Sequence, residues 1–229
     1  MFYTKQSATQ APSAYERNFG PGRQIRSTTA DSAPRSESPQ TPARAPTYGG
    51  SAGRGPRTAG CGENDAVVER FLADASLQAL ITQTPPAAEK DSADFDALFF
   101  PGGHGTMWDL PTDAGVTRAV EQAFAGGKLI ASVCHGAAGL VTPSGPTGRS
   151  IVEGLRVNAF TDSEERAVGL EHVVPFMLET RLRELGGKFE GGADWQPYAL
   201  RDGQLISGQN PQSSALAAGL LLQALGVSA

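Results

Sequence analysis

Residues 128–141 read KLIASVCHGAAGLV. The apolar run over 128–133 predicts a buried β-strand, and the small residues that follow Cys134 predict the start of a helix. A strand, one reactive side chain and a glycine-containing helix start form the layout of a nucleophile elbow, a tight turn that lifts the side chain above a sheet. This stretch therefore predicts an α/β fold in which Cys134 lies at the end of a strand.

The sequence on either side of this stretch alternates between strand and helix patterns. Apolar runs predict strands at 97–100 and 155–160, and the pattern over 198–208 predicts a hairpin that turns at Asp202-Gly203. This alternation favours an α/β sandwich around a mostly parallel sheet, with the active site at the carboxyl ends of the strands. Helical spacing of apolar residues predicts helices over 63–83, 115–127, 173–187 and 213–226.

The N-terminal part of the chain has a different composition. Residues 1–60 contain no Leu or Val, a single Ile and seven of the 16 prolines. They contain eight Lys or Arg and three acidic residues, which gives a net charge of +5. The rest of the chain contains eleven Lys or Arg and 21 acidic residues, which gives a net charge of −10. So polar a segment cannot bury enough apolar surface to offset the entropy of ordering it. We therefore expect a disordered segment over 1–62 and one domain over 63–229.

Three interpretations of this segment remain open. Its Arg-rich, Ser-rich and acid-poor composition is typical of an organelle transit peptide. Its positive charge also suits a basic arm that binds an acidic partner. Its excess of Arg over Lys, and of Pro, Ala, Gly and Thr, fits out-of-frame translation of GC-rich DNA, which is the interpretation we favour.

The overall composition narrows the class of protein. No run of about 18 apolar residues predicts a transmembrane helix, and no apolar signal-peptide core lies near the start. Two cysteines, Cys61 and Cys134, make no disulfide framework, which favours a reducing setting. The net charge of −5 argues against a nucleic-acid partner. We expect a cytoplasmic protein with neither a nucleic-acid nor a membrane partner.

Cys134 has two interpretations on the residues alone. A helix N-terminus favours a thiolate and would lower the pKa of Cys134 from about 8.5, and His135 could then act as acid and base. The alternative is an inert buried cysteine, which is common in protein cores. The glycines of PGGHG, residues 101–105, support the first interpretation because their unobstructed N–H groups could form an oxyanion hole.

Four motifs occur in an order that resembles one known superfamily. They are DFDALFFPGGHGTMWDLP (94–111), KLIASVCHGAAGLV (128–141), VNAFTDSEE (157–165) and LISGQNPQSS (205–214). They resemble the ThiJ/PfpI superfamily, which implies a class I glutamine-amidotransferase-like, flavodoxin-like fold over about 63–226. Within the superfamily the chain is most similar to the heat-shock-chaperone-like glyoxalase III branch.

The resemblance implies a Cys–His–acid triad. Cys134 matches the nucleophile and His135 the adjacent histidine of the family. Glu165 matches the acid, with Asp162 and Glu164 as rivals in the same cluster.

The resemblance also implies a substrate-binding region. The oxyanion donors would be the backbone amides of Gly103 and His135, and the substrate would contact Gly102, Gly103 and His104 at the mouth of the pocket. We expect His172 to cap or pack near a helix start instead.

The implied activity needs no cofactor and no metal. The thiolate would add to the aldehyde carbon of methylglyoxal, protons would move through an enediol, and hydrolysis of a thioester would release lactate. This is a glyoxalase III or D-lactate dehydratase activity, and related proteins are proposed to act as deglycases or stress chaperones. The expected partner is a small aldehyde. A homodimer is one possible assembly, because members of the family often pair.

The chain departs from the family in its N-terminal part. Relatives begin with a strand, a helix and a second strand, and a glutamate from that region contacts the cysteine. Neither is recognisable in residues 1–62, and Glu16 lies in polar sequence that is no credible replacement. We therefore expect the family's activity to be impaired in this polypeptide.

Other functions stay open beside this one. A glutaminase half of an amidotransferase is disfavoured because no His-x-Glu follows the cysteine. A PfpI-type cysteine peptidase shares the Cys-His pair, and a redox sensor or chaperone would oxidise Cys134 without turnover. A metal site is not expected, because the three histidines at 104, 135 and 172 show no ligand spacing.

Overall fold

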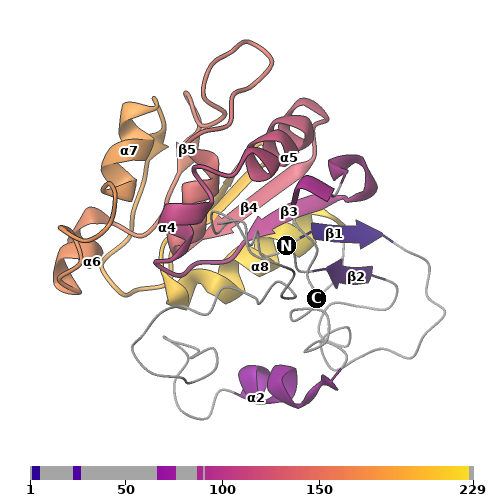
Figure 1. The fold of residues 1–229 in the computed structure, drawn as a ribbon. Coiled ribbons are helices and arrows are strands. Elements are labelled where there is room, and N and C mark those ends of the chain that lie inside the picture. Colours follow the sequence, from indigo (N-terminus) through magenta and orange to yellow (C-terminus); the bar gives the residue numbers. More distant parts are fainter. Residues whose placement is uncertain (1, 6–22, 27–65, 76–86, 90, 227–229) are drawn as a thin grey trace, which may run out of the picture.

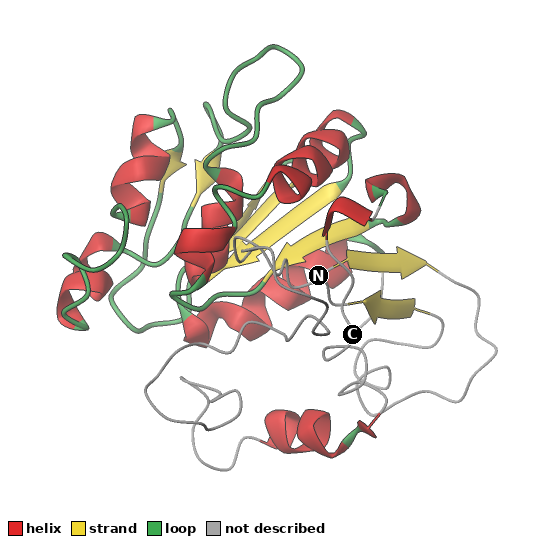
Figure 2. Cartoon of the chain, in the orientation of Figure 1, coloured by secondary structure: helices red, strands yellow, loops and turns green. Residues whose placement is uncertain are grey.

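The structure is a computed structural model of the chain. Its described residues form a six-stranded sheet with helices on both faces, and a separate two-stranded sheet (Figure 1, Figure 2). The expected α/β sandwich is therefore confirmed. The residues that the structure describes are 2–5, 23–26, 66–75, 87–89 and 91–226.

The large sheet has the strand order β2-β1-β3-β4-β8-β7. Its three central strands, β3, β4 and β8, run parallel, whereas the pairs β2-β1, β1-β3 and β8-β7 are antiparallel. In the small sheet β5 pairs with β6 in parallel. The strands are β1 Phe2–Lys5, β2 Arg23–Arg26, β3 Ala97–Phe100, β4 Leu129–Val133, β5 Arg156–Val157, β6 Lys188–Phe189, β7 Ala199–Asp202 and β8 Leu205–Gly208.

The helices of the described residues are short. The α-helices are α2 Ala66–Ala73, α4 Thr106–Asp109, α5 Ala114–Ala125, α6 Asp162–Ala167, α7 Leu178–Glu184 and α8 Ser214–Ala224. The 3₁₀ helices are η1 Ala87–Glu89, η2 Ser92–Asp94, η3 Cys134–Leu140 and η4 Pro211–Ser213. None of the helices in the described ranges is long and apolar enough to span a membrane.

The alternation of side chains along the central strands divides the core into two layers. Ile130 of β4 faces the layer that contains Val120 of α5, and both are buried. Ala131, the next residue of β4, faces the layer that contains Leu221 of α8. Since successive side chains of a strand point to opposite faces, one apolar strand packs against helices on both sides. The central strands are therefore packed on both faces, and this packing fixes the position of their carboxyl ends.

Local sequence signals set the ends of α5. The Asp113 side chain accepts a hydrogen bond from the Val116 N–H at 2.8 Å, which satisfies a free donor of the first turn. Gly126 is the C-cap, and Gly127 follows with a φ of 67°, a left-handed conformation that suits glycine. The strand over 97–100, the helix over 115–127 and the hairpin at Asp202-Gly203 are confirmed.

Two predicted elements are shorter in the structure than in the sequence pattern. The strand expected over 155–160 contains only the two residues of β5, because the chain then leaves the sheet toward α6. The helix expected over 173–187 begins only at Leu178, which is consistent with Pro175, since a proline restricts the residue before it away from the helical region. The helix expected over 63–83 is described only as α2, and residues 76–86 lie outside the described part.

Two short strands, β1 and β2, lie within residues 1–62. β1 pairs antiparallel with β3, with Phe2 opposite Leu98, and β2 pairs with β1 (Figure 1). This pairing covers an edge of β3 that would otherwise present unpaired backbone groups. Residues 6–22 and 27–65 lie outside the described residues, so both the remainder of the expected disorder and the boundary near residue 62 stay predictions.

Candidate active site

The turn after β4 has the geometry of a nucleophile elbow. Cys134 follows Val133 directly and has a φ of 56°, a left-handed conformation that is rare for a residue with a side chain. Gly136 lies so close to the preceding strand end that a Cβ atom there would be 2.1 Å from the Phe100 carbonyl oxygen. Glycine is thus required two residues after the cysteine, because the end of β3 approaches the turn closely and holds its strained backbone in place.

The sulfur of Cys134 lies beneath the glycines that follow β3. A Cβ atom on Gly102 would come within 3.2 Å of the Cys134 Sγ, so only glycine fits there without a shift. The backbone amides of Gly103 and His135 lie near the sulfur and act to lower the pKa of the thiol. Gly103 has a φ of 118°, which again suits glycine. These are the two amides that the family resemblance implied as oxyanion donors.

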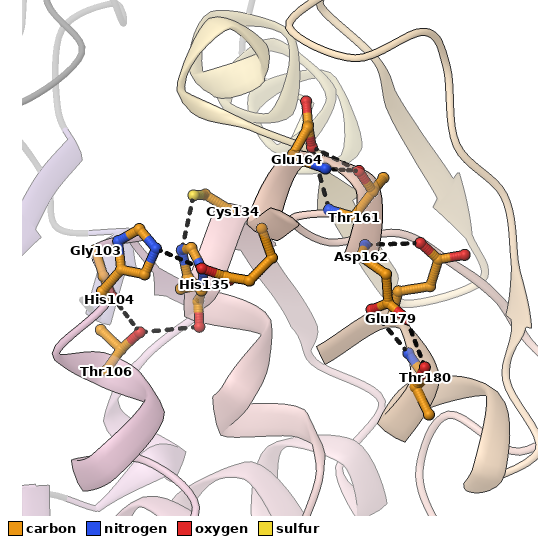
Figure 3. A network of polar contacts seen from close by, with 11 residues as sticks. Gly103, His104, Thr106, Cys134, His135, Thr161, Asp162, Glu164, Glu179 and Thr180 are labelled. Carbon is orange, nitrogen blue, oxygen red and sulfur yellow. Dashed lines mark hydrogen bonds and ion pairs between the residues drawn. The ribbon is translucent and has the colours of Figure 1, made fainter. Parts of the chain in front are cut away.

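A chain of side-chain contacts runs from the sulfur to Glu165. The Cys134 Sγ is 3.3 Å from the His135 Nδ1 (Figure 3). The His135 Nε2 is 2.6 Å from the Glu165 Oε2. His135 and Glu165 are both buried, with 1% and 3% of their surface exposed. The arrangement can move a proton from sulfur to an imidazole whose far nitrogen is held by a carboxylate.

The two rivals of Glu165 face away from His135. Asp162 accepts hydrogen bonds from the Thr180 N–H and hydroxyl, which ties α6 to α7. Glu164 points in a different direction from α6 and accepts hydrogen bonds from backbone and amide N–H groups. Among the three acids of the cluster, only Glu165 contacts His135.

Glu164 is the most deeply buried acid of this cluster, with no exposed surface. Its Oε1 accepts hydrogen bonds from the Trp195 N–H at 2.8 Å, the Gln209 Nε2 at 3.2 Å and the Asn210 Nδ2 at 2.8 Å. Its Oε2 accepts from the Thr161 N–H at 3.1 Å in a capping box (Figure 3). Glu164 therefore joins the start of α6 to the segment after β8.

His104 lies at the exposed end of the same group. Its side chain is 35% exposed, and its Nε2 is 2.9 Å from the Glu165 Oε1. Its ring is stacked beside that of His135, with centroids 3.9 Å apart (Figure 3). The expected position of His104 at the mouth of the site fits this exposure, but its contact with Glu165 was not anticipated from the sequence.

Two further residues shape the site and were missed by the sequence analysis. The Thr106 hydroxyl lies 2.6 Å from the Gly103 carbonyl oxygen and 2.9 Å from that of His135, so it joins the two strand ends. The Phe160 ring packs against the His135 ring with centroids 4.5 Å apart. Each lies within one of the four quoted motifs, but nothing in its residue type signalled the contact.

Burial changes the expected ionisation of Cys134. Only 6% of the residue is exposed, and burial raises the pKa of the Cys134 thiol to about 12. The amides of His135 and Gly103 act in the opposite direction but do not outweigh burial. This direction is opposite to the lowered cysteine pKa expected from the helix start, and it favours a neutral thiol at rest.

The other two members of the contact chain are shifted downward. Burial lowers the pKa of His135, although the hydrogen bond to Glu165 acts against it. Burial would raise the pKa of Glu165, but the hydrogen bonds from His104 and His135 outweigh that effect and lower the pKa to about 2. At neutral pH the site thus contains a thiol, a neutral His135 and an ionised Glu165.

The fold also brings together three possible metal ligands that are far apart in the sequence. One ligand atom each from His104, His135 and Glu165 lies within 4.8 Å of the others, a set that could hold a metal ion. The spacing of the histidines in the sequence did not indicate this set, which forms because two strand ends and α6 converge. The expectation that the protein has no metal site stays a prediction. His172 takes no part, since its side chain is 91% exposed and near only Glu171.

Fold and site together define a class of protein, an α/β protein whose cysteine projects from a strand-to-helix turn beside a histidine and a glutamate. The family model described as the DJ-1/PfpI family matches residues 61–167. The chain is similar to the DJ-1/PfpI family over these residues, and the resemblance found in the four motifs is confirmed.

Several relatives extend this result. A glutathione-independent glyoxalase from Saccharomyces cerevisiae is 28% identical over 149 residues, 62% of this chain and 62% of that protein. A probable glutathione-independent glyoxalase from Schizosaccharomyces pombe is 31% identical over 144 residues, 61% of this chain and 65% of that protein. The chain therefore spans less than two thirds of the length of these curated relatives.

A solved structure supports the fold independently. The X-ray structure of Rapid Encystment Protein 24 KDa from Francisella tularensis superposes with a TM-score of 0.69 at 36% identity. The match covers 72% of this chain and 73% of that one.

Proposed function

We propose that the chain is a cofactor-independent glyoxalase of the glyoxalase III type, which converts methylglyoxal or a similar small 2-oxoaldehyde to the 2-hydroxy acid. One observation carries the proposal: the Cys134 sulfur lies under two backbone amides and within reach of a histidine that a buried glutamate orients. The names of the curated relatives, glutathione-independent glyoxalases, support the same reaction.

The first step needs a base, because the resting thiol is protonated. The Cys134 proton moves to the Nδ1 of His135 as the sulfur bonds to the aldehyde carbon, and the hemithioacetal forms. Glu165 stabilises the imidazolium that results, because its carboxylate already holds the Nε2 of that ring. The amides of Gly103 and His135 lie next to the sulfur, where they can donate to the oxyanion of the adduct.

The second step moves hydrogen within the substrate and needs no external oxidant. His135 first gives its proton to the oxyanion of the adduct, which leaves the imidazole neutral. It then takes the proton from the former aldehyde carbon and delivers it to the neighbouring carbonyl carbon through an enediol, while the hydroxyl proton of the adduct passes to the neighbouring oxygen. The first carbon is thereby oxidised to a thioester while the second is reduced to an alcohol. Water then cleaves the thioester, which releases the hydroxy acid and returns the proton to Cys134.

The alternative functions receive less support. A redox sensor needs a cysteine that an oxidant can reach, whereas only 6% of Cys134 is exposed. A peptidase of the PfpI type would share the Cys134–His135 pair, and peptide hydrolysis is therefore measured beside glyoxalase activity. The reduced turnover expected from the unrecognised N-terminal glutamate stays a prediction, because residues 6–22 and 27–65 lie outside the described residues.

The experiment measures lactate formed from methylglyoxal by the full chain without glutathione. We expect Cys134→Ser to reduce the rate to background, because a hydroxyl is a far weaker nucleophile than sulfur. His172→Gln is the matched control, since that histidine is exposed and remote from the contact chain. Turnover that survives Cys134→Ser would rule out the cysteine mechanism, and turnover of peptide but not aldehyde would favour the peptidase.

A further inference from the structure

Glu165 contacts two histidines, whereas the proposed reaction uses only one of these contacts. His135 occupies one carboxylate oxygen at 2.6 Å and His104 occupies the other at 2.9 Å. A cysteine–histidine–acid relay requires only the first of these contacts. His104 contacts Glu165 through its Nε2 atom from the exposed side of the site. The proposed reaction assigns no proton transfer to His104.

The atoms that converge on this point are those that bind zinc. Both imidazoles present their Nε2 atoms to the carboxylate, and one ligand atom from each of the three residues lies within 4.8 Å of the others. Zinc–ligand bonds are about 2.0–2.2 Å long, so one ion can join ligand atoms that are roughly 4 Å apart or closer. His104 is 35% exposed and can rotate to close the set, whereas His135 and Glu165 are fixed by burial.

The chemistry of the set also selects the kind of cation. Two imidazoles with one carboxylate suit zinc and similar transition metals, whereas magnesium and calcium prefer oxygen ligands alone. Three protein ligands leave a position open for water or substrate. The half-exposed His104 lies at the solvent side of the set and gives an entering ion a first ligand.

We propose that His104, His135 and Glu165 form an inhibitory site for zinc or a chemically similar divalent cation. A cation on the Nε2 of His135 requires the single hydrogen of the neutral ring to lie on Nδ1. The Nδ1 atom, 3.3 Å from the Cys134 sulfur, can then no longer accept the thiol proton. The cation also occupies the carboxylate that would stabilise an imidazolium at His135.

The binding site itself stands on geometry, and only its inhibitory consequence rests on the proposed function. The geometry also distinguishes this site from one in which a cysteine thiolate binds the zinc. The Cys134 sulfur contacts the Nδ1 of His135, whereas the ion is placed at the Nε2, on the other side of the ring. Cys134 is therefore not expected to be a ligand.

The test measures zinc binding to the full chain by calorimetry after chelator treatment. We expect about one ion per chain, and at least tenfold weaker binding in His104→Gln, since loss of even a second-shell partner commonly costs about 10–100-fold. His172→Gln and Cys134→Ser should bind as the unmodified chain does. Unchanged affinity in His104→Gln, or loss of binding in Cys134→Ser, would overturn the proposal.

A second measurement does not depend on whether a variant folds. Cobalt bound to the unmodified chain should show ligand-field absorption without a thiolate charge-transfer band, whereas such a band would place the sulfur on the metal and overturn the proposal. If methylglyoxal is turned over, zinc should inhibit in a way that chelator reverses, and more weakly in His104→Gln. If it is not turned over, the proposed function fails while the binding experiments still decide on the site.

Discussion

Glu164 and Glu165 are neighbours on α6 and both are buried, yet they have opposite surroundings. Glu165 faces two imidazoles, whereas Glu164 faces backbone and amide N–H groups from three separate segments. Successive side chains on a helix point about 100° apart, so adjacent carboxylates can serve two different partners. The comparison teaches that burial and charge alone do not identify a catalytic acid; the partner atoms do.

The sharpest test of this comparison is Glu165→Gln, for which we expect the largest effect. The amide cannot stabilise an imidazolium at His135 as a carboxylate does, so turnover of methylglyoxal should fall by about 10²–10⁴-fold. The fold should change little, because the side chain keeps its size and one oxygen. The measurement is kcat together with the melting temperature. A large fall in melting temperature without loss of kcat would show that Glu165 has the structural role and is not the acid of the reaction.

Glu164→Gln should show the reverse pattern. Its carboxylate accepts five donors, and an amide nitrogen would face the Thr161 N–H or the donors of the segment after β8. Leaving a buried donor unsatisfied costs about 1–3 kcal/mol, so the free energy of unfolding should fall by that amount. Denaturant unfolding beside Glu165→Gln gives the matched comparison. Equal stability of the two variants would contradict a structural role for Glu164.

The two variants should differ again in the reactivity of Cys134. With the pKa of the thiol raised to about 12, alkylation by iodoacetamide should be slow at neutral pH and rise about tenfold per pH unit between pH 7 and 9, since the thiolate reacts. The charges of Glu164 and Glu165 both raise this pKa, and Glu164 has the larger effect of the two. In chelator-treated protein, Glu164→Gln should therefore increase the alkylation rate more than Glu165→Gln does. A plateau near neutral pH would show that the thiol is already ionised.

The local sequence was sufficient for the elements that position the site. The run over 128–133 gave β4, the turn signal at Asp202-Gly203 gave the hairpin, and Gly126 ended α5. Strand ends of a parallel sheet meet at one edge, which is why the sequence placed Cys134 beside Gly102 and Gly103. Glu165 came from the resemblance and not from the residues, since an acidic first turn is equally typical of a solvated helix start.

The remaining features depend on contacts between distant segments, and no local pattern encodes them. The meeting of His104 with Glu165 joins residues 61 positions apart, and the bond from Asn210 to Glu164 joins residues 46 apart. The direction of the Cys134 pKa shift was also not predictable from the local sequence, because it depends on contacts with distant segments. A helix start suggested a lowered pKa, but the depth to which the neighbouring strands and Phe160 bury the sulfur decides its sign.

The smallest expected effect comes from Thr161→Ala, which removes the capping hydroxyl at the start of α6. The Thr161 hydroxyl accepts from the Glu164 N–H at 3.1 Å while the Glu164 carboxylate returns a bond to the Thr161 N–H. Loss of such a cap typically costs about 1 kcal/mol of stability. Since the backbone N–H of Thr161 still bonds to Glu164, Glu165 should keep its place against His135. We therefore expect kcat to change less than twofold while the unfolding midpoint falls, and a larger loss of kcat than in Glu164→Gln would mean that the cap, rather than the buried carboxylate, orients Glu165.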